Sequence, residues 1–183
     1  KIKSKIKNNV NNTIDLKYEI ELGEKAYISS IKFIGDKKIK DRKLKNIIVS
    51  EESKFWKFIS KKKFVDSNRI KLDEKLLKNY YKNNGYYNVK VYSSFAQLID
   101  SNNFELVFNI SAGEKFKFNN ITLDIPKGFS KDDFQEISKT MNKLKGKNYS
   151  INRIDKILKE IDKIVIQKQF EFINASYTET LGA

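Results

Sequence analysis

Hydrophobic and polar residues alternate in the same way over two stretches of the chain. In residues 14–20 and again in residues 104–110 every second position is apolar, which is the period of a β-strand with one buried face. Each stretch is followed by the same Gly-Glu-Lys corner, at Gly23 and at Gly113, an offset of 90 residues, and then by a further strand-like segment. A repeat at this spacing predicts two copies of one small domain joined in tandem.

The first complete repeat is predicted to contain a strand, two helices and two further strands. Its long helix has the clearest end, because apolar residues recur at helical spacing up to Tyr81 and Gly85 then follows as a C-terminal stop. Residues 100–103 have the composition of a hairpin turn. The predicted elements are a strand over 27–34 that ends at Gly35-Asp36, a short helix from Asp41, a long helix over 66–84 and strands over 89–98 and 104–110.

The second repeat is predicted to follow the same order. A strand over 115–125 is closed by Pro126, Ser130 and Ser150 begin two helices, and residues 170–180 are expected to begin a final hairpin. Two helices covering one face of a three-stranded sheet give an α+β fold class of order β-α-α-β-β. Residues 14–20 have no predicted partner before them. The expected domains are therefore 1–22, the terminal strand of a preceding unit, 23–112, a complete unit, and 113–183, a unit truncated at its C-terminal end.

Composition agrees with a folded globular chain. Of the 183 residues 33% are charged and 39% are hydrophobic, and no apolar run approaches the roughly 20 residues of a spanning helix. The formal net charge of +14 suggests a nucleic-acid or anionic-membrane partner. The lysines are scattered along every segment, however, which favours a solvated surface. The absence of cysteine excludes disulfides and is compatible with a cytosol or with a bacterial periplasm.

The sequence offers little for catalysis. It has no His and no Cys, so it lacks a neutral-pH base and a thiol nucleophile. The adjacent carboxylates Asp73-Glu74 and Asp132-Asp133 point in different directions on a helix, and we interpret them as solvated residues or as partners of a helix dipole. We therefore predict no enzyme activity, no catalytic or metal-binding residue and no cofactor.

Four motifs carry a resemblance to a known family. They are Gly35-Asp36 after the first strand, a loop centred on Trp56, Tyr80-Tyr81-x-x-x-Gly85-Tyr86 at the end of the long helix, and Asn109-Ile110-x-x-Gly113-Glu114 before the second repeat. In this order the chain resembles the POTRA domains of the BamA family, the periplasmic arm of the outer-membrane β-barrel assembly machine. The likeness is closest to the third POTRA domain over 23–112, followed by the fourth over 113–183. The chain departs at Gly35-Asp36, where the family usually has Gly-Asn, and at Gln169-Phe170, where Gly-Tyr is expected.

The resemblance implies a three-stranded mixed sheet with a working edge. A small sheet with helices on one face leaves an outer strand with unpaired backbone groups, on which an extended chain can dock by main-chain pairing. In POTRA domains the implied edge is the second strand of the unit. The residues expected to bind a client strand are Val89, Lys90, Val91, Tyr92, Ser93, Ser94 and Phe95, and those expected to form an inter-unit hinge are Ser111, Ala112, Gly113 and Glu114. Lys90 is equally compatible with a guard against aggregation.

The resemblance also implies partners and a compartment. It implies a periplasmic scaffold, part of an outer-membrane protein, that binds unfolded outer-membrane proteins and docks accessory assembly lipoproteins. A related alternative is a POTRA segment of a translocation or two-partner secretion transporter. An alternative of another class is a basic nucleic-acid-binding module built on Lys61-Lys62-Lys63. In that case the tyrosines at 80, 81, 86 and 87 would stack on bases, whereas we interpret them as core and inter-unit contacts and expect no nucleic acid. Contact with an anionic membrane surface is compatible with the first interpretation.

Overall fold

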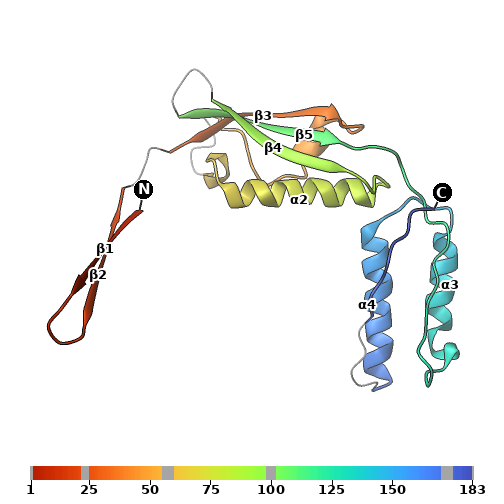
Figure 1. Cartoon of the computed structure of the whole chain (residues 1–183). Coiled ribbons are helices and arrows are strands. Elements are labelled where there is room, and N and C mark those ends of the chain that lie inside the picture. Colours follow the sequence, from red (N-terminus) through yellow and green to blue (C-terminus); the bar gives the residue numbers. More distant parts are fainter. Residues whose placement is uncertain (1, 22–24, 55–59, 98–101, 170–174, 183) are drawn as a thin grey trace.

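The computed structural model of the chain describes residues 2–21, 25–54, 60–97, 102–169 and 175–182. The described part contains an N-terminal hairpin, an α+β unit and a pair of long helices (Figure 1). The corner at Gly23, the loop at Trp56 and residues 100–101 of the turn predicted at 100–103 lie outside the described residues.

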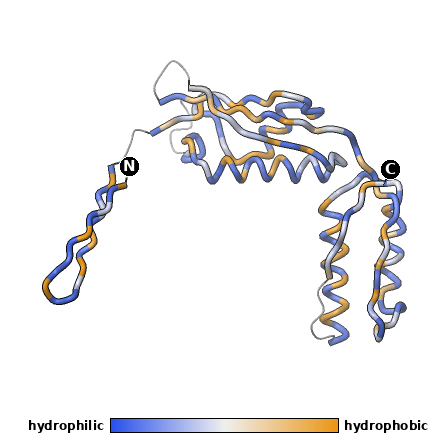
Figure 2. The backbone as a smooth tube through the Cα atoms, in the orientation of Figure 1, coloured by the Kyte–Doolittle hydropathy of each residue, from blue (hydrophilic) through white to orange (hydrophobic). Residues whose placement is uncertain are grey.

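The N-terminal hairpin pairs β1 (Ile2–Asn8) with β2 (Ile14–Ile20) in antiparallel register, with Ile6 opposite Leu16. The strand over 14–20 is thus confirmed, but it has a partner within the chain that the sequence did not reveal. Figure 2 shows hydrophobic segments along both arms of the hairpin. These apolar side chains are uncovered, since Ile6 is 67% and Leu16 59% exposed.

The unit over 27–111 is built on a three-stranded mixed sheet of order β3-β5-β4. The central strand β5 (Asn103–Ser111) pairs in parallel with β3 (Tyr27–Asp36) and antiparallel with β4 (Lys90–Gln97). The helix α2 (Ser67–Asn83) lies along one face of this sheet (Figure 1), where the short helix α1 (Asp41–Lys45) also buries Leu44 in the core. The α+β fold class and the mixed sheet are therefore confirmed for this unit.

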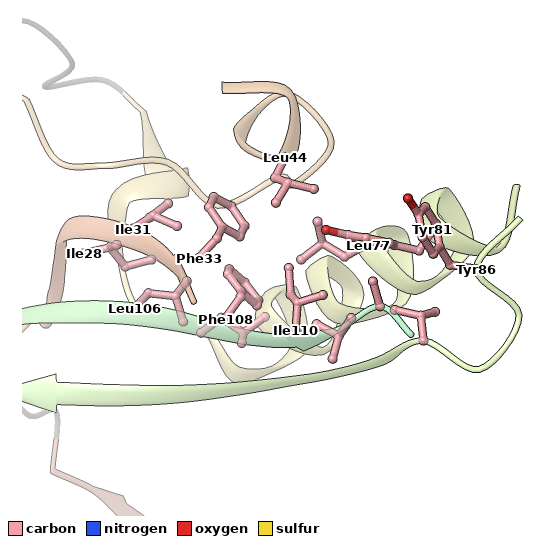
Figure 3. Close-up of a cluster of buried hydrophobic side chains, with 14 residues drawn as sticks. Ile28, Ile31, Phe33, Leu44, Leu77, Tyr81, Tyr86, Leu106, Phe108 and Ile110 are labelled. Atoms are coloured by element: carbon pink, nitrogen blue, oxygen red, sulfur yellow. The ribbon is translucent and has the colours of Figure 1, made fainter. Parts of the chain in front are cut away.

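The core of this unit lies between the sheet and the two helices (Figure 3). Leu106, Phe108 and Ile110 of β5 alternate toward the helices and are fully buried. On β3 the register shifts between Ile28 and Ser30, and this bulge lets Ile28 and Ile31 face the same core although they are three residues apart. The other buried members shown in Figure 3 are Phe33 from β3, Leu44 from α1, Leu77 and Tyr81 from α2, and Tyr86.

Gly35 closes the end of β3 against the central strand. Its φ is +87°, and a Cβ placed on it would lie 2.4 Å from the carbonyl oxygen of Ile110. Gly113 has a similar φ of +70°, but no described heavy atom lies within 4 Å of the position of its Cβ. We expect Gly35→Ala to lower the free energy of unfolding by about 3 kcal/mol, because strain and a backbone clash add. Gly113→Ala is the matched control and should cost about 1 kcal/mol. Equal effects in urea unfolding would contradict this account.

The second unit is a pair of helices with an extended segment beside them. A 3-10 turn, η2 (Lys131–Phe134), leads into α3 (Gln135–Leu144), and α4 (Ile151–Gln167) follows. Buried residues of the helices form one apolar cluster, against which Ile121, Leu123 and Ile125 pack partly buried. The two predicted helices of the second repeat are thus present.

The predicted strand over 115–125 is wrong for this structure. Within the described part of the second unit the only pairing is an isolated bridge between Lys117 and Asn148, and residues 175–182 form no strand. The reason is the separation in sequence between a strand in this position and the strand that pairs with it. In the first unit β3 is held by β5, as where Ser29 donates to the carbonyl of Phe104, 75 residues further along. The same spacing from Phe118 leads past residue 183, and the described residues of the second unit include no strand in the position of β5.

Candidate functional site

The two edges of the three-stranded sheet differ in what covers them. The outer edge of β3 is contacted by residues 51–54 and 60–65 of the same chain. The amide of Ser53 donates to the carbonyl of Ile28 at 2.6 Å, and the amide of Val65 donates to the carbonyl of Ala26 at 2.9 Å. The first part of the β3 edge, over residues 26–28, is therefore closed to a further strand.

A side chain completes the closure of β3. The amide of Ile31 donates to Glu52 Oε1 at 3.0 Å, and Lys45 Nζ donates to the same oxygen at 2.5 Å. Burial alone would raise the pKa of Glu52, but these two hydrogen bonds outweigh it and hold the pKa below its usual value.

The depressed pKa of Glu52 predicts a pH-dependent contribution to stability. The contribution is present above the unfolded pKa near 4.5 and is lost as pH falls through the lower folded value. Wild type should therefore be more stable than Glu52→Gln at pH 7, by about 1 kcal/mol. The difference should shrink between about pH 5 and about pH 3, as measured by urea unfolding. A difference that stays constant with pH would show that the charge of Glu52 has no part in this closure.

The outer edge of β4 has no such cover. Among the described residues, the backbone of β4 makes its backbone hydrogen bonds with β5 alone. The amide of Ser93, which lies opposite Phe108, points away from β5, because it donates to a side chain of α2 instead. Since outward and inward groups alternate along an antiparallel strand, Val91 and Phe95 also present their N–H and C=O groups outward.

The predicted client-binding residues divide between the two faces of β4. Val89 precedes the strand and is buried. On the helix-covered face Val91 is fully buried, Ser93 is half-buried, and Phe95 is 42% exposed, with its ring edge-on to Phe104. On the opposite face three side chains are exposed, those of Lys90, Tyr92 and Ser94. The predicted segment is therefore a true edge strand over Lys90–Gln97, with Val89 outside it.

The adjacent carboxylates Asp73-Glu74 have roles that sequence reasoning missed. Asp73 is not solvated but fully buried, and it accepts the amides of Val49 at 2.5 Å and of Ser50 at 3.2 Å. Glu74 accepts the outward amide of Ser93 at 2.8 Å. The helical position of Asp73, three residues after Ile70 and four before Leu77 on the buried side of α2, was the available signal for its burial. No local signal connects Glu74 to a strand 19 residues later.

The predicted hinge is only partly free. Ser111 is the last residue of β5, and Ala112 is fully buried, with its amide donating to the carbonyl of Asp36 at 2.9 Å. Gly113 and Glu114 follow, and Gly113 adopts a positive φ. The inter-unit hinge at 111–114 stays a prediction, and Gly113 and Glu114 are the two of its residues that lie outside β5 and the buried Ala112.

The two units also contact each other through side chains outside residues 111–114, and we call this contact the joint. Asn83, the last residue of α2, accepts hydrogen bonds on Oδ1 from the hydroxyl of Ser150 and from the amide of Asn152, both at 2.9 Å. Ser150 is the N-cap of α4, so the first unit supplies the side chain that caps this helix. Tyr87 packs edge-on against Tyr149 at 5.0 Å between ring centroids.

Because Asn83 caps α4 across this joint, we expect its substitution to affect the first turn of α4 and substitution of the neighbouring Asn84 to leave that turn unchanged. Asn83→Ala removes the acceptor, and we expect the first turn of α4 to lose about 1 kcal/mol of protection. Hydrogen exchange at the amide of Asn152 should accelerate about fivefold. The control is Asn84→Ala, whose side chain donates to Tyr80 within its own helix. Equal exchange at Asn152 in both variants would contradict the capping role of Asn83.

Some of the residues expected of a nucleic-acid site are buried in the fold, although Lys61 and Lys62 are exposed. Lys61-Lys62-Lys63 forms a short 3-10 turn, η1 (Lys61–Lys63), in which Lys63 is buried with its Nζ over the rings of Tyr27 and Phe64. Tyr81 is fully buried and its hydroxyl donates to the carbonyl of Lys37, while burial raises its pKa. The interpretation of these tyrosines as core and inter-unit contacts agrees with this geometry.

No group of three or more His, Cys, Asp or Glu side chains among the described residues is arranged to hold a metal ion. No helix in the same part of the chain combines the length and the apolar character needed to cross a membrane. The expectation that the chain is not an enzyme stays a prediction.

Comparison with known proteins agrees with this architecture. The family model for POTRA, described as surface antigen variable number repeat, matches residues 26–113. The chain is 22% identical over 156 residues to the outer membrane protein assembly factor BamA of Neisseria meningitidis serogroup B, covering 82% of this chain and 19% of the relative. It is 26% identical over 111 residues to BamA of Buchnera aphidicola, covering 60% of this chain and 18% of the relative.

Two solved structures share the fold. POTRA domains 3–5 of Haemophilus influenzae BamA superpose with a TM-score of 0.60 at 13% identity, covering 88% of this chain and 59% of that one. POTRA domains 1–2 of the periplasmic domain of Omp85 from Anabaena give a TM-score of 0.50 at 11% identity, covering 87% of this chain and 90% of that one.

The order of elements and the sheet define a small α+β domain of the POTRA type, with one open edge. The POTRA family model matches residues 26–113, and the resemblance to the POTRA domains of BamA is confirmed. The chain spans less than a fifth of the length of the two curated relatives, at 19% and 18%. The numbering of its units as third and fourth stays a prediction.

Proposed function

We propose that this chain is a segment of the periplasmic scaffold of an outer-membrane protein assembly factor, and that the β4 edge binds unfolded β-barrel proteins by β-augmentation. The observation that carries the proposal is the difference between the edges. Residues 51–54 and 60–65 cover the first part of β3, whereas the backbone of β4 pairs only with β5 in the described part of the chain. The curated relatives are named outer membrane protein assembly factors, and this supports assembly of outer-membrane proteins as the process in which the chain acts.

The strength expected of such a contact suits a transient binder. About four added main-chain hydrogen bonds at roughly 1 kcal/mol net each would give about 4 kcal/mol, a Kd of about 1 mM. Main-chain pairing ignores most of the client sequence, and several such edges in one arm would raise the overall affinity by effective concentration. A client can then be held and passed on.

The domain assignment follows the same proposal. Residues 1–22 belong to the end of a preceding unit, 23–112 are a complete unit and 113–183 begin another, with a hinge at 111–114. The uncovered apolar side of the hairpin supports the first assignment, since Leu16 and Ile6 are more than half exposed and an isolated two-stranded hairpin is marginal in water. Accessory assembly lipoproteins are the further partners of this proposal, and the net charge of +14 suits an approach to anionic lipid head groups. The proposed function includes no cofactor, no nucleic acid and no catalytic step.

An amide titration of the whole chain tests the docking edge. The probe is a ten-residue peptide taken from a strand of an outer-membrane β-barrel, added to protein labelled with 15N. We expect shifts at Val91, Ser93 and Phe95, with a midpoint at about 1 mM.

Peptide variants supply the matched control. Methylating the backbone nitrogens at alternate positions removes the N–H groups of one side of the peptide. Methylation of the side that pairs should abolish the shifts, because the new strand loses its donors, and methylation of the other side should leave them. Shifts confined to the faces of α3 and α4, or equal effects of the two methylated peptides, would overturn the proposal.

A further inference from the structure

One carboxylate of α2 reaches the open edge of the sheet. Glu74 is half-buried, and its Oε1 accepts the outward amide of Ser93 at 2.8 Å. A strand docking along the whole of β4 would place one of its own carbonyl oxygens at this amide. Glu74 therefore holds the position that an incoming backbone acceptor needs.

Packing of the neighbouring residues fixes Glu74 in this position. Leu77 and Ile70 on α2 are buried in the core, and Asp73 is anchored to the amides of Val49 and Ser50. These contacts set the rotation of the helix about its axis. The next residue, Glu74, is thereby directed toward the side of the sheet on which β4 lies.

We propose that Glu74 is an internal competitor that gates the β4 edge against strand pairing. This inference rests on the proposed function, since it concerns the same edge. The carboxylate satisfies the outward amide of Ser93, and among the described residues nothing occupies the outward amides of Val91 and Phe95 on either side of it. An extended peptide strand must displace Glu74 to pair across the whole edge, and a strand that cannot do so is limited to one end of it.

The gate has a physical benefit for an edge strand. An unprotected row of outward N–H and C=O groups favours pairing between copies of the same chain. A charged side chain placed over the edge raises the cost of such pairing without preventing it, because the same hydrogen bond can be exchanged for one to a client carbonyl. Glu74 thus selects for partners that offer a full set of backbone acceptors.

Substitution of Glu74 in the full chain tests this role. Glu74→Ala removes the acceptor and should tighten binding of the ten-residue β-barrel peptide about five- to tenfold. Glu74→Gln keeps an oxygen acceptor without the charge and should lie between Glu74→Ala and wild type. Glu136→Ala removes the same charge from an exposed side chain on α3 and should leave peptide affinity unchanged. Without peptide, the amide of Ser93 should exchange faster with solvent in Glu74→Ala than in wild type.

The outcomes separate the gate from the docking function. If wild type binds the peptide and Glu74→Ala binds it equally, the gate is overturned while the docking edge stands. Binding by Glu74→Ala alone would support the gate and contradict docking by the unmodified chain. Absence of binding in every variant overturns both. Unchanged exchange at Ser93 in Glu74→Ala would show that the amide is not held by this carboxylate and overturns the gate. Self-association of Glu74→Ala at high concentration, read by sedimentation, supports the gate with a second copy as the pairing strand.

Discussion

Asp73→Ala is expected to lower the free energy of unfolding of the unit over 27–111 by about 3 kcal/mol. The carboxylate is fully buried and accepts two backbone amides, those of Val49 at 2.5 Å and Ser50 at 3.2 Å. Alanine would leave both donors buried without an acceptor, and each such group costs about 1–3 kcal/mol. Urea unfolding of wild type and variant measures the difference.

Two substitutions check the cause of this loss. Asp73→Asn keeps one acceptor oxygen in nearly the same volume and should cost about half as much as alanine. Glu74→Ala changes the adjacent carboxylate, which bonds an amide at the open edge where water can replace it, and should cost less than about 1 kcal/mol. A loss in Glu74→Ala as large as that in Asp73→Ala would show that helix propensity or charge, and not the buried amides, is responsible.

Asp73 also connects the core to the closed edge of the sheet. The amides it accepts belong to residues 49–50, and the chain then continues into Glu52 and Ser53, which cover the outer side of β3. The same helix carries Glu74 at the opposite edge. Two adjacent carboxylates of α2 thus act on different edges: Asp73 supports the loop that closes one, and Glu74 occupies one amide of the other.

Local signals predicted the central unit well. The alternation of Leu106, Phe108 and Ile110 and the glycine stop after Tyr81 each depend on residues close in sequence, and β5 and α2 formed where they were predicted. The edge position of the strand over 89–98 was implied by the resemblance, and the structure places β4 at an edge.

Non-local contacts account for what the sequence did not show. Residues 115–125 have a strand-like alternation, but a strand needs a partner, and the 183 residues do not contain one at the spacing seen in the first unit. The segment Ile2–Asn8 is rich in lysine, and it forms a strand because it pairs with residues 14–20 across a short connection. The helical position of Asp73 signals its burial, but the amides that it accepts belong to residues 49–50, more than 20 residues earlier, and no local pattern could reveal them.

Phe108→Ala is expected to have an effect at least as large, about 4 kcal/mol, because a fully buried aromatic ring is replaced by a cavity. Phe108 lies in the middle of the central strand and stacks on Phe33 of β3 at 5.5 Å between ring centroids. Across the sheet it lies opposite Ser93 of β4. Its loss therefore weakens both strand pairings at once.

Phe95→Ala is the matched control for this substitution. Its ring is 42% exposed at the open edge, so its removal should cost about 1 kcal/mol of stability or less. If the two variants lost equal stability, the centre of the sheet would be no better packed than its edge. If they differ as expected, the open edge is supported by a core that does not depend on the edge side chains. Substitutions along β4 can then change strand binding while the unit stays folded.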